Sequence, residues 1–329
     1  MVEEHTHERD NLAPWLLEEL TNDWGDEKVD KLVKVFPRLS PWFLSVNHPV
    51  GSTEDERTRL ENQICESFDG RILPQGSIRV SETLHGPVHI WPGYYEGLWF
   101  VQDPSATLPA LALKSALDRS DNDNTVADMH VVDMCAAPGG KTSLLASLGF
   151  GKITAVEKSE RRSRLMTKNG QRLKYMDRCE MVVADGTEWV PKAEDPPVVG
   201  CLVDAPCSAT GTARKNPDVL HRNQDLGNLL EMQEKLAFHC ADNVLSVGGI
   251  LIYATCSLLK RENEDVAHRL LERSDGESQL VTIPFEKGEI PGYDEAIDEN
   301  GWLRVLPGAL EGDLAICDGF FVARFRKVA

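Results

Sequence analysis

Two cysteines stand in short motifs whose flanking residues favour a reactive site over a buried core. Cys207 belongs to Asp-Ala-Pro-Cys-Ser-Ala-Thr-Gly at 204–211, and Cys256 belongs to Tyr-Ala-Thr-Cys-Ser at 253–257. An isolated cysteine is most often a small buried residue. The proline before Cys207 and the glycine that closes its motif indicate instead a constrained loop. We therefore treat the two thiols as a candidate pair.

Two thiols beside a carboxyl group suit the methylation of a pyrimidine carbon. A thiolate is a good nucleophile near neutral pH even when it is a minor species. C5 of cytosine takes a methyl group poorly, but addition of a thiolate at C6 turns the ring into a reactive enamine. A proton held near N3 relieves the developing negative charge, and Asp204 is placed for that role. The second thiol can act as the base that removes the C5 proton. The residues alone leave open which cysteine attacks.

A glycine-rich loop, Asp-Met-Cys-Ala-Ala-Pro-Gly-Gly-Lys-Thr at 133–142, predicts a nucleotide-type ligand, because adjacent glycines let backbone amides approach a ligand closely. The spacing is not the Gly-x-Gly-x-x-Gly of dinucleotide sites, and Cys135 stands where a phosphate-binding loop needs its first glycine. Acidic residues end the next three apolar runs, at Glu157, Asp185 and Asp204. Such carboxylates can accept from ribose hydroxyls. Taken singly, each could equally cap the following loop or helix.

Alternating strands and helices must position these residues. Apolar runs fall at 131–134, 153–156, 181–184, 198–203 and 250–253, with helical stretches at 143–148, 161–175 and 226–245. This order predicts right-handed crossovers and a parallel sheet. A last pair of runs, 279–283 and 319–326, predicts antiparallel edge strands. The fold class is therefore α/β, with a doubly wound, mostly parallel sheet of about seven strands.

The first hundred residues have a different pattern. Apolar residues at helical spacing over 12–36 predict two short helices. Short apolar stretches separated by Gly and Pro over 40–100, with a helical segment at 54–67, predict a small α+β module. We expect a division into an N-terminal region, 1–100, and a catalytic domain, 101–329.

Charge gives a mixed signal for an RNA enzyme. The formal net charge is -18, whereas 152–178 contains nine Lys and Arg against three acidic residues, a local excess of +6. Phosphate contacts dominate affinity for nucleic acid, so this cluster is a candidate contact region. A solvated helix face is an equal explanation.

Composition excludes several other classes. No apolar run reaches the ~18 residues of a membrane helix, and the acidic, polar start lacks the pattern of a secretory signal. The eight cysteines are scattered without a Cys-x-x-Cys pair, which disfavours a zinc site and a disulfide framework. We expect a monomer that uses no metal and no membrane. It should be cytoplasmic, or nucleolar or organellar in a eukaryote.

Taken together, the motifs resemble those of the Sun-type RNA 5-methylcytosine methyltransferases, and most closely the RsmB-like enzymes that act on 16S ribosomal RNA. The likeness rests on the glycine-rich loop and both cysteine motifs, on Arg-Lys-Asn-Pro-Asp at 214–218, and on Glu-Asn-Glu at 262–264. It also includes Val-Gln-Asp-Pro-Ser-Ala at 101–106 and the tail at 318–327. Enzymes of the RsmB type usually carry a further N-terminal helical domain like the antitermination factor NusB, which we expect this chain to be without.

The resemblance implies a fold, a cofactor and residue roles. The fold is a Rossmann-like methyltransferase core preceded by a ferredoxin-like module used for RNA, and the cofactor is S-adenosylmethionine. The attacking cysteine is the Thr-Cys one, Cys256, while the Pro-Cys one, Cys207, releases the product. This division is not obvious from chemistry, since DNA cytosine enzymes attack with a Pro-Cys cysteine. The family's cofactor positions correspond to Cys135, Ala136, Ala137, Pro138, Gly139, Gly140, Lys141, Glu157, Asp185 and Asp204.

The expected partner is RNA, ribosomal or transfer. A target cytosine must be single-stranded or flipped out of a helix. Residues expected to bind flanking phosphates are Arg214, Lys215 and Arg222, and aromatic candidates for base stacking are Tyr94, Tyr95 and Trp99. For Trp99, core packing is the favoured alternative. The competing class is a non-catalytic RNA-binding factor for ribosome assembly, which loss of a cysteine or of the glycine loop would have favoured.

Overall fold

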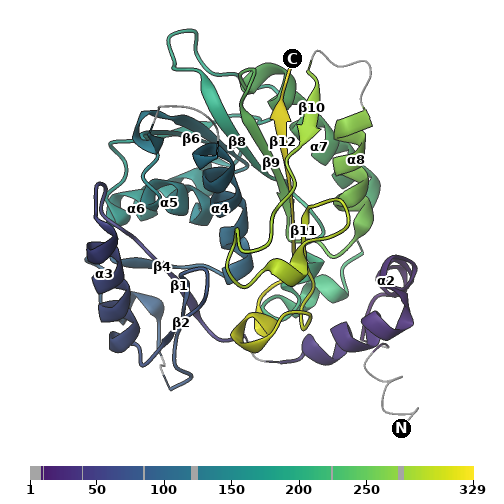
Figure 1. Ribbon diagram of the computed structural model, residues 1–329. Helices are drawn as coiled ribbons and strands as arrows, with labels where there is room; N and C mark the ends of the chain where they lie inside the picture. Colours follow the sequence, from purple (N-terminus) through teal and green to yellow (C-terminus); the bar gives the residue numbers. More distant parts are fainter. Residues whose placement is uncertain are drawn as a thin grey trace.

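The computed structural model describes residues 9, 11–38, 40–83, 86–119, 125–223, 225–272 and 278–329. An eight-stranded sheet crosses the molecule in the order β10-β12-β9-β8-β5-β6-β7, with β11 pairing to β12 (Figure 1). The strands are β5 (His130–Met134), β6 (Lys152–Glu157), β7 (Cys179–Val183), β8 (Val198–Asp204), β9 (Ile250–Thr255), β10 (Leu280–Thr282), β11 (Leu303–Val305) and β12 (Phe320–Lys327). The predicted α/β class is confirmed.

The parallel part of the sheet has a switch point between β5 and β8. From β5 the chain winds outward through β6 and β7, then crosses to β8 and β9 on the other side. Ligands of doubly wound sheets bind in the crevice at the carboxyl ends of the strands at such a point. The glycine-rich loop follows β5 and the Cys207 motif follows β8, so both predicted motifs flank this crevice.

The antiparallel edge differs in detail from the prediction. β12 pairs antiparallel with both β9 and β10, as an edge arrangement requires. β11 adds an eighth strand, antiparallel to β12, that the sequence pattern did not indicate. Its three residues are too few to show the alternation that identifies a strand.

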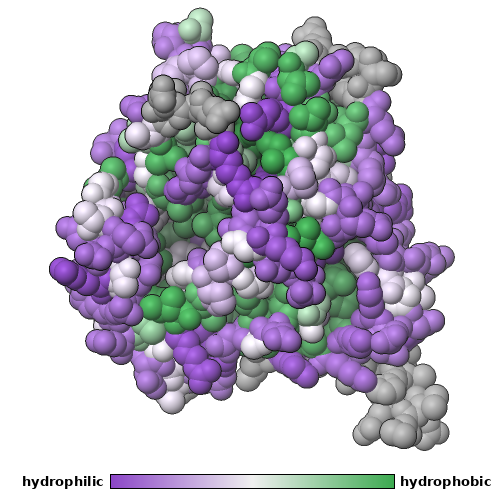
Figure 2. Space-filling view, viewed as in Figure 1, coloured by the Kyte–Doolittle hydropathy of each residue, from purple (hydrophilic) through white to green (hydrophobic). Residues whose placement is uncertain are grey.

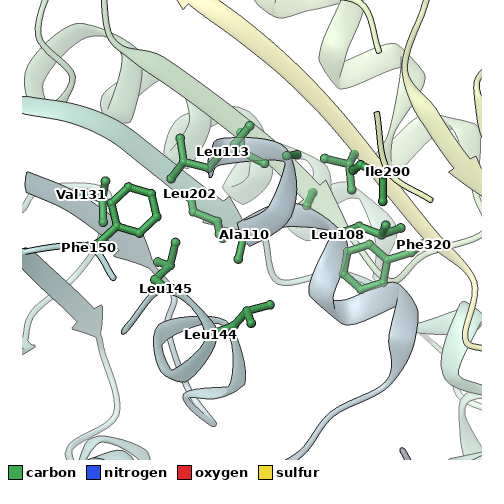
Figure 3. Packing of buried hydrophobic residues seen from close by; sticks show 14 of the residues in the cluster. Leu108, Ala110, Leu113, Val131, Leu144, Leu145, Phe150, Leu202, Ile290 and Phe320 are labelled. Carbon is green, nitrogen blue, oxygen red and sulfur yellow. The ribbon is translucent and has the colours of Figure 1, made fainter. Parts of the chain in front are cut away.

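Helices cover the two faces of the sheet. One face carries α4 (Pro104–Asp118), α5 (Gly140–Ser147) and α6 (Glu160–Leu173), and the other carries α7 (Leu226–His239) and α8 (Glu264–Glu272). Figure 3 shows Leu113 of α4 beside Leu202 of the sheet, Leu145 of α5 on the side of Val131, and Leu108 of α4 near Phe320 of β12. The sequence analysis did not identify α4, which begins at an N-cap, Asp103, whose side chain accepts from Ser105 N at 3.0 Å.

The N-terminal region forms a second, antiparallel sheet. Its strands are β1 (Phe43–Val46), β2 (Arg71–Ile72), β3 (Ile78–Arg79) and β4 (Trp99–Val101), in the order β2-β3-β1-β4. This is the strand order of a ferredoxin-like sheet. The helix α3 (Glu54–Ser67) joins β1 to β2 and starts with a capping box between Thr53 and Glu56. Between β3 and β4, the described residues contain a short 3₁₀ turn, η1 (Val88–Ile90), in place of a second helix.

Gly25 and Asn47 shape the N-terminal region. The helical segment α2 (Pro14–Val35) is interrupted at Gly25, whose φ of 73° breaks it into the two predicted helices. Asn47 bridges the module and the core, because its Nδ2 donates to Gly97 O at 2.8 Å and to Leu173 O at 2.9 Å. Most of the surface seen in Figure 2 is hydrophilic, as the charged composition requires.

Candidate active site

The glycine-rich loop turns sharply between β5 and α5. Cys135 adopts a left-handed φ of 60°, and Gly139 has φ of 99° at the N-cap of α5. A side chain at Gly139 would be strained there and would lie 3.2 Å from Met166 Cγ of α6. The loop is fastened to the next strand, since Ala136 N donates to Val156 O at 3.0 Å. The positive φ and this close packing explain the glycine at 139.

The predicted carboxylates at the ends of β6 and β7 lie at one cavity. Glu157 is buried and accepts from Ala137 N at 3.3 Å and from Ser159 N at 2.8 Å. Asp185 accepts from Thr187 N at 3.0 Å, and Lys158 donates to it at 2.7 Å. The Lys158 hydrogen bond, with those from Thr187, holds the pKa of Asp185 well below its usual range.

The cofactor residues predicted from the sequence are divided between two cavities. A cavity of about 380 Å³ is lined by Cys135, Glu157 and Asp185, with apolar walls that include Val156 and Met232. A larger cavity of about 670 Å³ is lined by five of the other seven predicted members: Ala136, Pro138, Gly140, Lys141 and Asp204. Ala137 and Gly139 line neither of these two cavities. The loop that follows β5 therefore contributes to both.

A lysine and an aspartate form an ion pair in the larger cavity. Lys141 Nζ donates to Asp204 Oδ2 at 2.6 Å, and both side chains are largely buried. Burial by itself would lower the pKa of Lys141, but the Asp204 carboxylate, together with the nearby charge of Cys256, raises it. A cation thus lies beside the residues singled out for covalent chemistry.

Asp133 lies behind this pair and was given no role in the sequence analysis. It is fully buried on β5, and Thr142 Oγ1 donates to its Oδ2 at 2.5 Å. Burial raises the pKa of Asp133 to about 7, partly offset by the Thr142 hydrogen bond and the charge of Lys141. The apolar run that contains Asp133 offered the signal, since a carboxyl group within a buried strand needs a specific partner.

The two predicted cysteines meet at the carboxyl ends of β8 and β9. Cys207 Sγ lies 3.6 Å from Cys256 Sγ, and both side chains are partly accessible. The hydrogen bond with Cys256, followed by burial, raises the pKa of the Cys207 thiol well above its ordinary value. Cys135 is separate from this pair, and burial raises the pKa of its thiol to about 12. Cys135 is thus a thiol of the cavity wall and not a third nucleophile.

Backbone contacts hold the two cysteine loops together. Gly211 N donates to Cys256 O at 2.9 Å, and Gly319 N donates to Gly211 O at 2.9 Å. A Cβ at Gly211 would lie 2.4 Å from Gly319 O and 2.7 Å from Cys256 O. The glycine that ends the Cys207 motif is therefore needed because three backbone segments meet there.

The predicted phosphate-binding residues are mostly engaged within the fold. Arg214 is buried and donates to Ile316 O, while Lys215 donates to Asp103 and, at 2.8 Å, to Asp318. Both line the larger cavity. Arg222 is exposed, pairs with Asp218 and is not among the residues that line either cavity. Arg214 and Lys215 thus lie beside Asp204 but are paired with protein groups.

The aromatic candidates divide in a similar way. Trp99 is fully buried and donates to Pro92 O at 2.7 Å, so its packing role is confirmed. Tyr94 lies against the Arg172 guanidinium at 4.2 Å, whereas Tyr95 is 73% exposed. Trp42, which the sequence analysis did not single out, is 47% exposed and lines the larger cavity. An exposed tryptophan at a cavity rim is a better stacking candidate than Trp99.

Comparison with known proteins identifies the family of this chain. The profile of the family described as 16S rRNA methyltransferase RsmB/F matches residues 117–326. The chain belongs to this family. Its relatives include ribosomal RNA small subunit methyltransferase B of Xanthomonas campestris pv. campestris, 32% identical over 321 residues, which cover 96% of this chain and 66% of that protein. Ribosomal RNA small subunit methyltransferase F of Shewanella halifaxensis is 34% identical, over 72% of this chain and 48% of its own length.

Solved structures resemble this chain along nearly its whole length. A methyltransferase homologue from Pyrococcus horikoshii has a TM-score of 0.72 and 25% identity, covering 98% of this chain and 99% of its own. NSun6 from Pyrococcus horikoshii, crystallised with SFG, has a TM-score of 0.69 and 19% identity, covering 95% and 97%. The RsmB/F family uses S-adenosylmethionine, so the predicted family, Rossmann-like fold and cofactor are confirmed. The chain spans about two thirds, or less, of the length of the RsmB and RsmF relatives it matches.

Two further features concern membranes and metals. Within the described ranges, no helix is both long and apolar enough to span a bilayer. The described residues also contain no cluster of three or more His, Cys, Asp or Glu side chains arranged to bind a metal ion.

Proposed function

We propose that this chain transfers a methyl group from S-adenosylmethionine to C5 of a cytosine in ribosomal RNA, through a covalent bond between Cys256 and C6. The observation that carries the proposal is the pair of sulfurs 3.6 Å apart beside the Lys141–Asp204 ion pair. A single thiol beside a cation would be compatible with many nucleophilic reactions. Two thiols this close together suit a reaction in which one sulfur forms a covalent adduct and the other helps to release it.

The smaller cavity fits the cofactor. Its carboxylates, Glu157 and Asp185, lie at the ends of neighbouring strands, where ribose hydroxyls can donate to them. The side chains of Val156, Leu229 and Met232 supply apolar walls for an adenine ring. The loop that follows β5 contributes to both cavities, Cys135 to the smaller and Ala136 to the larger. When bound, S-adenosylmethionine supplies the electrophilic methyl group.

The chain's own residues carry the rest of the reaction. The Cys256 sulfur adds to C6, while Lys141 and Asp204 hold a proton at the N3 edge and so accommodate the electron pair displaced from the ring. C5 then forms a bond to the methyl carbon, whose bond to sulfur breaks. Cys207 first releases its own proton to water and then, as thiolate, takes the C5 proton. The electrons of that C–H bond restore the ring double bond as the C6–Sγ bond breaks, which regenerates the Cys256 thiolate.

A mechanism-based substrate tests the nucleophile. RNA containing 5-azacytidine has nitrogen at position 5, so the adduct cannot lose a proton there and should persist with the unmodified chain and cofactor. Cys256→Ala should abolish the adduct, which is read as a gel shift that survives denaturation. Cys65→Ala is the matched control, because Cys65 is another partly exposed thiol, in the N-terminal module, and should leave the adduct unchanged. An adduct that persists in Cys256→Ala would refute the assignment.

Ribosomal RNA is the proposed substrate because the family and the relatives named above act on the small ribosomal subunit. Bisulfite sequencing of total RNA from cells with and without the gene would test this. A protected cytosine in small-subunit RNA that is lost with the gene is expected. Loss of a protected cytosine only in transfer RNA would show the same chemistry on another substrate, and no change would favour the non-catalytic alternative.

A further inference from the structure

Glu262, at the end of the 3₁₀ turn η6 (Lys260–Glu262), is a fully buried carboxylate between the two cysteine loops. It accepts four hydrogen bonds from described groups. Oε1 accepts from Ser208 N at 2.8 Å and from Gln233 Nε2 at 2.9 Å. Oε2 accepts from Ser208 Oγ at 2.5 Å and from Ser257 Oγ. Every described contact of this carboxylate is thus with a hydrogen-bond donor.

The donors to Glu262 come from both reactive loops. Ser208 is the residue after Cys207, and Ser257 is the residue after Cys256. The two serine hydroxyls also lie 3.0 Å apart. A single carboxylate thus fixes the position of the residue next to each sulfur, and with it the 3.6 Å separation of the sulfurs. Gln233 adds a third attachment, because its Nε2 also donates to the carbonyl of Pro206, just before Cys207.

All four donors are neutral, which makes this an expensive way to stabilise a fold. A buried charge loses its hydration, and neutral hydrogen bonds compensate for that loss only in part. A neutral acceptor, such as an amide oxygen, would hold the same loops without burying a charge. The retained charge therefore points to an effect on a neighbouring group.

The neighbouring group is Cys207. The titratable side chains that face it are Cys256 from the loop after β9, Tyr253 from β9 and Glu262 itself. The hydrogen bond with Cys256 and burial raise the pKa of Cys207, and the charge of Glu262 adds to this rise. The charge of Cys256 acts on the cation Lys141, whereas the charge of Glu262 acts on Cys207. The two sulfurs therefore have different charged neighbours.

We propose that Glu262 is a positioning residue that locks the two cysteine loops together and makes Cys207 the sulfur of the pair that keeps its proton. Cys256 is then left as the sulfur that attacks, with the Cys207 S–H as its hydrogen-bond donor. The inference rests on the proposed division of labour between the cysteines and gives it a physical cause in this chain. The fold alone would leave two similar thiols side by side.

Glu262→Gln separates the charge from the shape. The amide can keep its oxygen toward Ser208 N and Gln233 and turn its NH₂ toward the serine hydroxyls, which can accept as well as donate. In protein without RNA, site-resolved alkylation of Cys207 and Cys256 by iodoacetamide is followed from neutral to alkaline pH. We expect Cys207 to react on the order of ten-fold faster at neutral pH, since the thiolate fraction rises ten-fold for each unit by which the pKa falls. An unchanged pH profile of Cys207 in folded Glu262→Gln would overturn the proposal.

Glu289→Gln is the matched control. Glu289 is also buried, accepts from Ser115 Oγ at 2.6 Å and pairs with Arg324, far from the cysteines along the chain. It should lower the thermal midpoint without moving the Cys207 profile. A purely structural role for Glu262 would make the two variants behave alike.

Gln233→Met keeps the proposal testable if Glu262→Gln does not fold. It removes one donor from the carboxylate, and the Gln233 Oε1 that it also removes has no hydrogen-bond partner among the described residues. With its charge less balanced, Glu262 should make Cys207 alkylate several-fold more slowly at a given pH. Equal or faster alkylation would contradict the proposal. The alkylation needs no RNA, so an adduct that survives in Cys256→Ala would refute the proposed function while leaving this result intact.

Discussion

The short distance between Cys207 and Cys256 is of use only if each sulfur does a different step. In the proposed reaction, one bond must form to C6, and one proton must leave C5 before that bond can break. Cys207 lies 3.6 Å from Cys256 and so within reach of the same ring. Loss of either thiol should therefore stop the reaction at a different point.

Cys207→Ala should trap the enzyme on ordinary RNA. Without the base, the methylated ring keeps its C5 proton and the C6–Sγ bond cannot break. We expect a covalent complex that accumulates with unmodified cytosine RNA and cofactor, measured by denaturing gel. The double variant Cys207→Ala/Cys256→Ala should form none. Normal turnover by Cys207→Ala would show that another group removes the proton.

Asp133 should leave a signature in the pH dependence of stability. Its pKa is about 7 in the fold and near 3.8 in the unfolded chain, so the fold binds the proton more tightly. This stabilisation is complete below about pH 4 and is lost as the pH rises through 7. For Asp133→Asn, urea unfolding midpoints should fall less steeply between about pH 4 and pH 7 than for the unmodified chain. Parallel curves would mean that Asp133 is ionised in the fold.

At the residue scale, the sequence predicted the members of the site better than their contacts. Cys207, Cys256, Asp204 and the glycine loop were identifiable because loop residues with reactive side chains follow buried strands. Glu262 was part of a quoted motif but had no assigned role, since its partners come from 208, 233 and 257. Arg214 and Lys215 look like phosphate ligands in sequence, and only the fold shows their internal partners Asp103, Ile316 and Asp318.

Among the elements, the loops after β8 and β9 are held together by a contact between backbone atoms. Gly211 brings its own backbone against those of Cys256 and Gly319. Position 211 requires a glycine because a Cβ would meet neighbouring backbone atoms, which cannot rotate away as a side chain can.

Gly211→Ala should separate the loops and lower both stability and adduct formation. Overpacking of this kind typically costs about 1–3 kcal/mol, which chemical denaturation can measure. Gly227→Ala is a suitable control, because Gly227 lies in the first turn of α7 and its added Cβ would lie 3.3 Å from a flexible Asp225 carboxylate. That variant should be neutral or more stable, by up to about 1 kcal/mol. Equal stability of the two variants would argue against the close backbone contact.

The sequence predicted helices and strands correctly where the apolar pattern extended over a full element, and it missed elements in which that pattern was short or unclear. The five parallel strands and the helices α5, α6 and α7 all fall near their expected ranges. β11 has three residues, and α4 carries Pro109 and apolar residues around much of its surface, so neither shows a clear period.

At the scale of the whole molecule, the proposed RNA substrate requires an acidic protein to attract a polyanion. The cations of α6 are the candidates: Arg161, Arg164 and Lys168 are exposed along a helix that begins beside the cofactor loop. Arg162 of the same helix donates to Ala137 O at 2.6 Å, so the helix is fixed to that loop.

Replacing these three cations with alanine should weaken RNA binding and flatten its dependence on salt. Each lost phosphate contact should reduce the slope of log affinity against log salt by about 0.7 to 0.9. Lys28, Lys31 and Lys34 of α2 provide a triple-alanine control with the same change in net charge. Filter binding at several salt concentrations would measure both. Equal loss in the two triple variants would show a general charge effect without a defined surface.

The bridge made by Asn47 bears on how such an enzyme could diversify. Its amide is bonded to backbone carbonyls on both sides, Gly97 in the module and Leu173 in the catalytic core. Because the acceptors are backbone carbonyls, substitutions of exposed side chains leave these hydrogen bonds in place. The outward-facing residues of the module can therefore change to suit a different RNA without altering the distance between that surface and the two sulfurs.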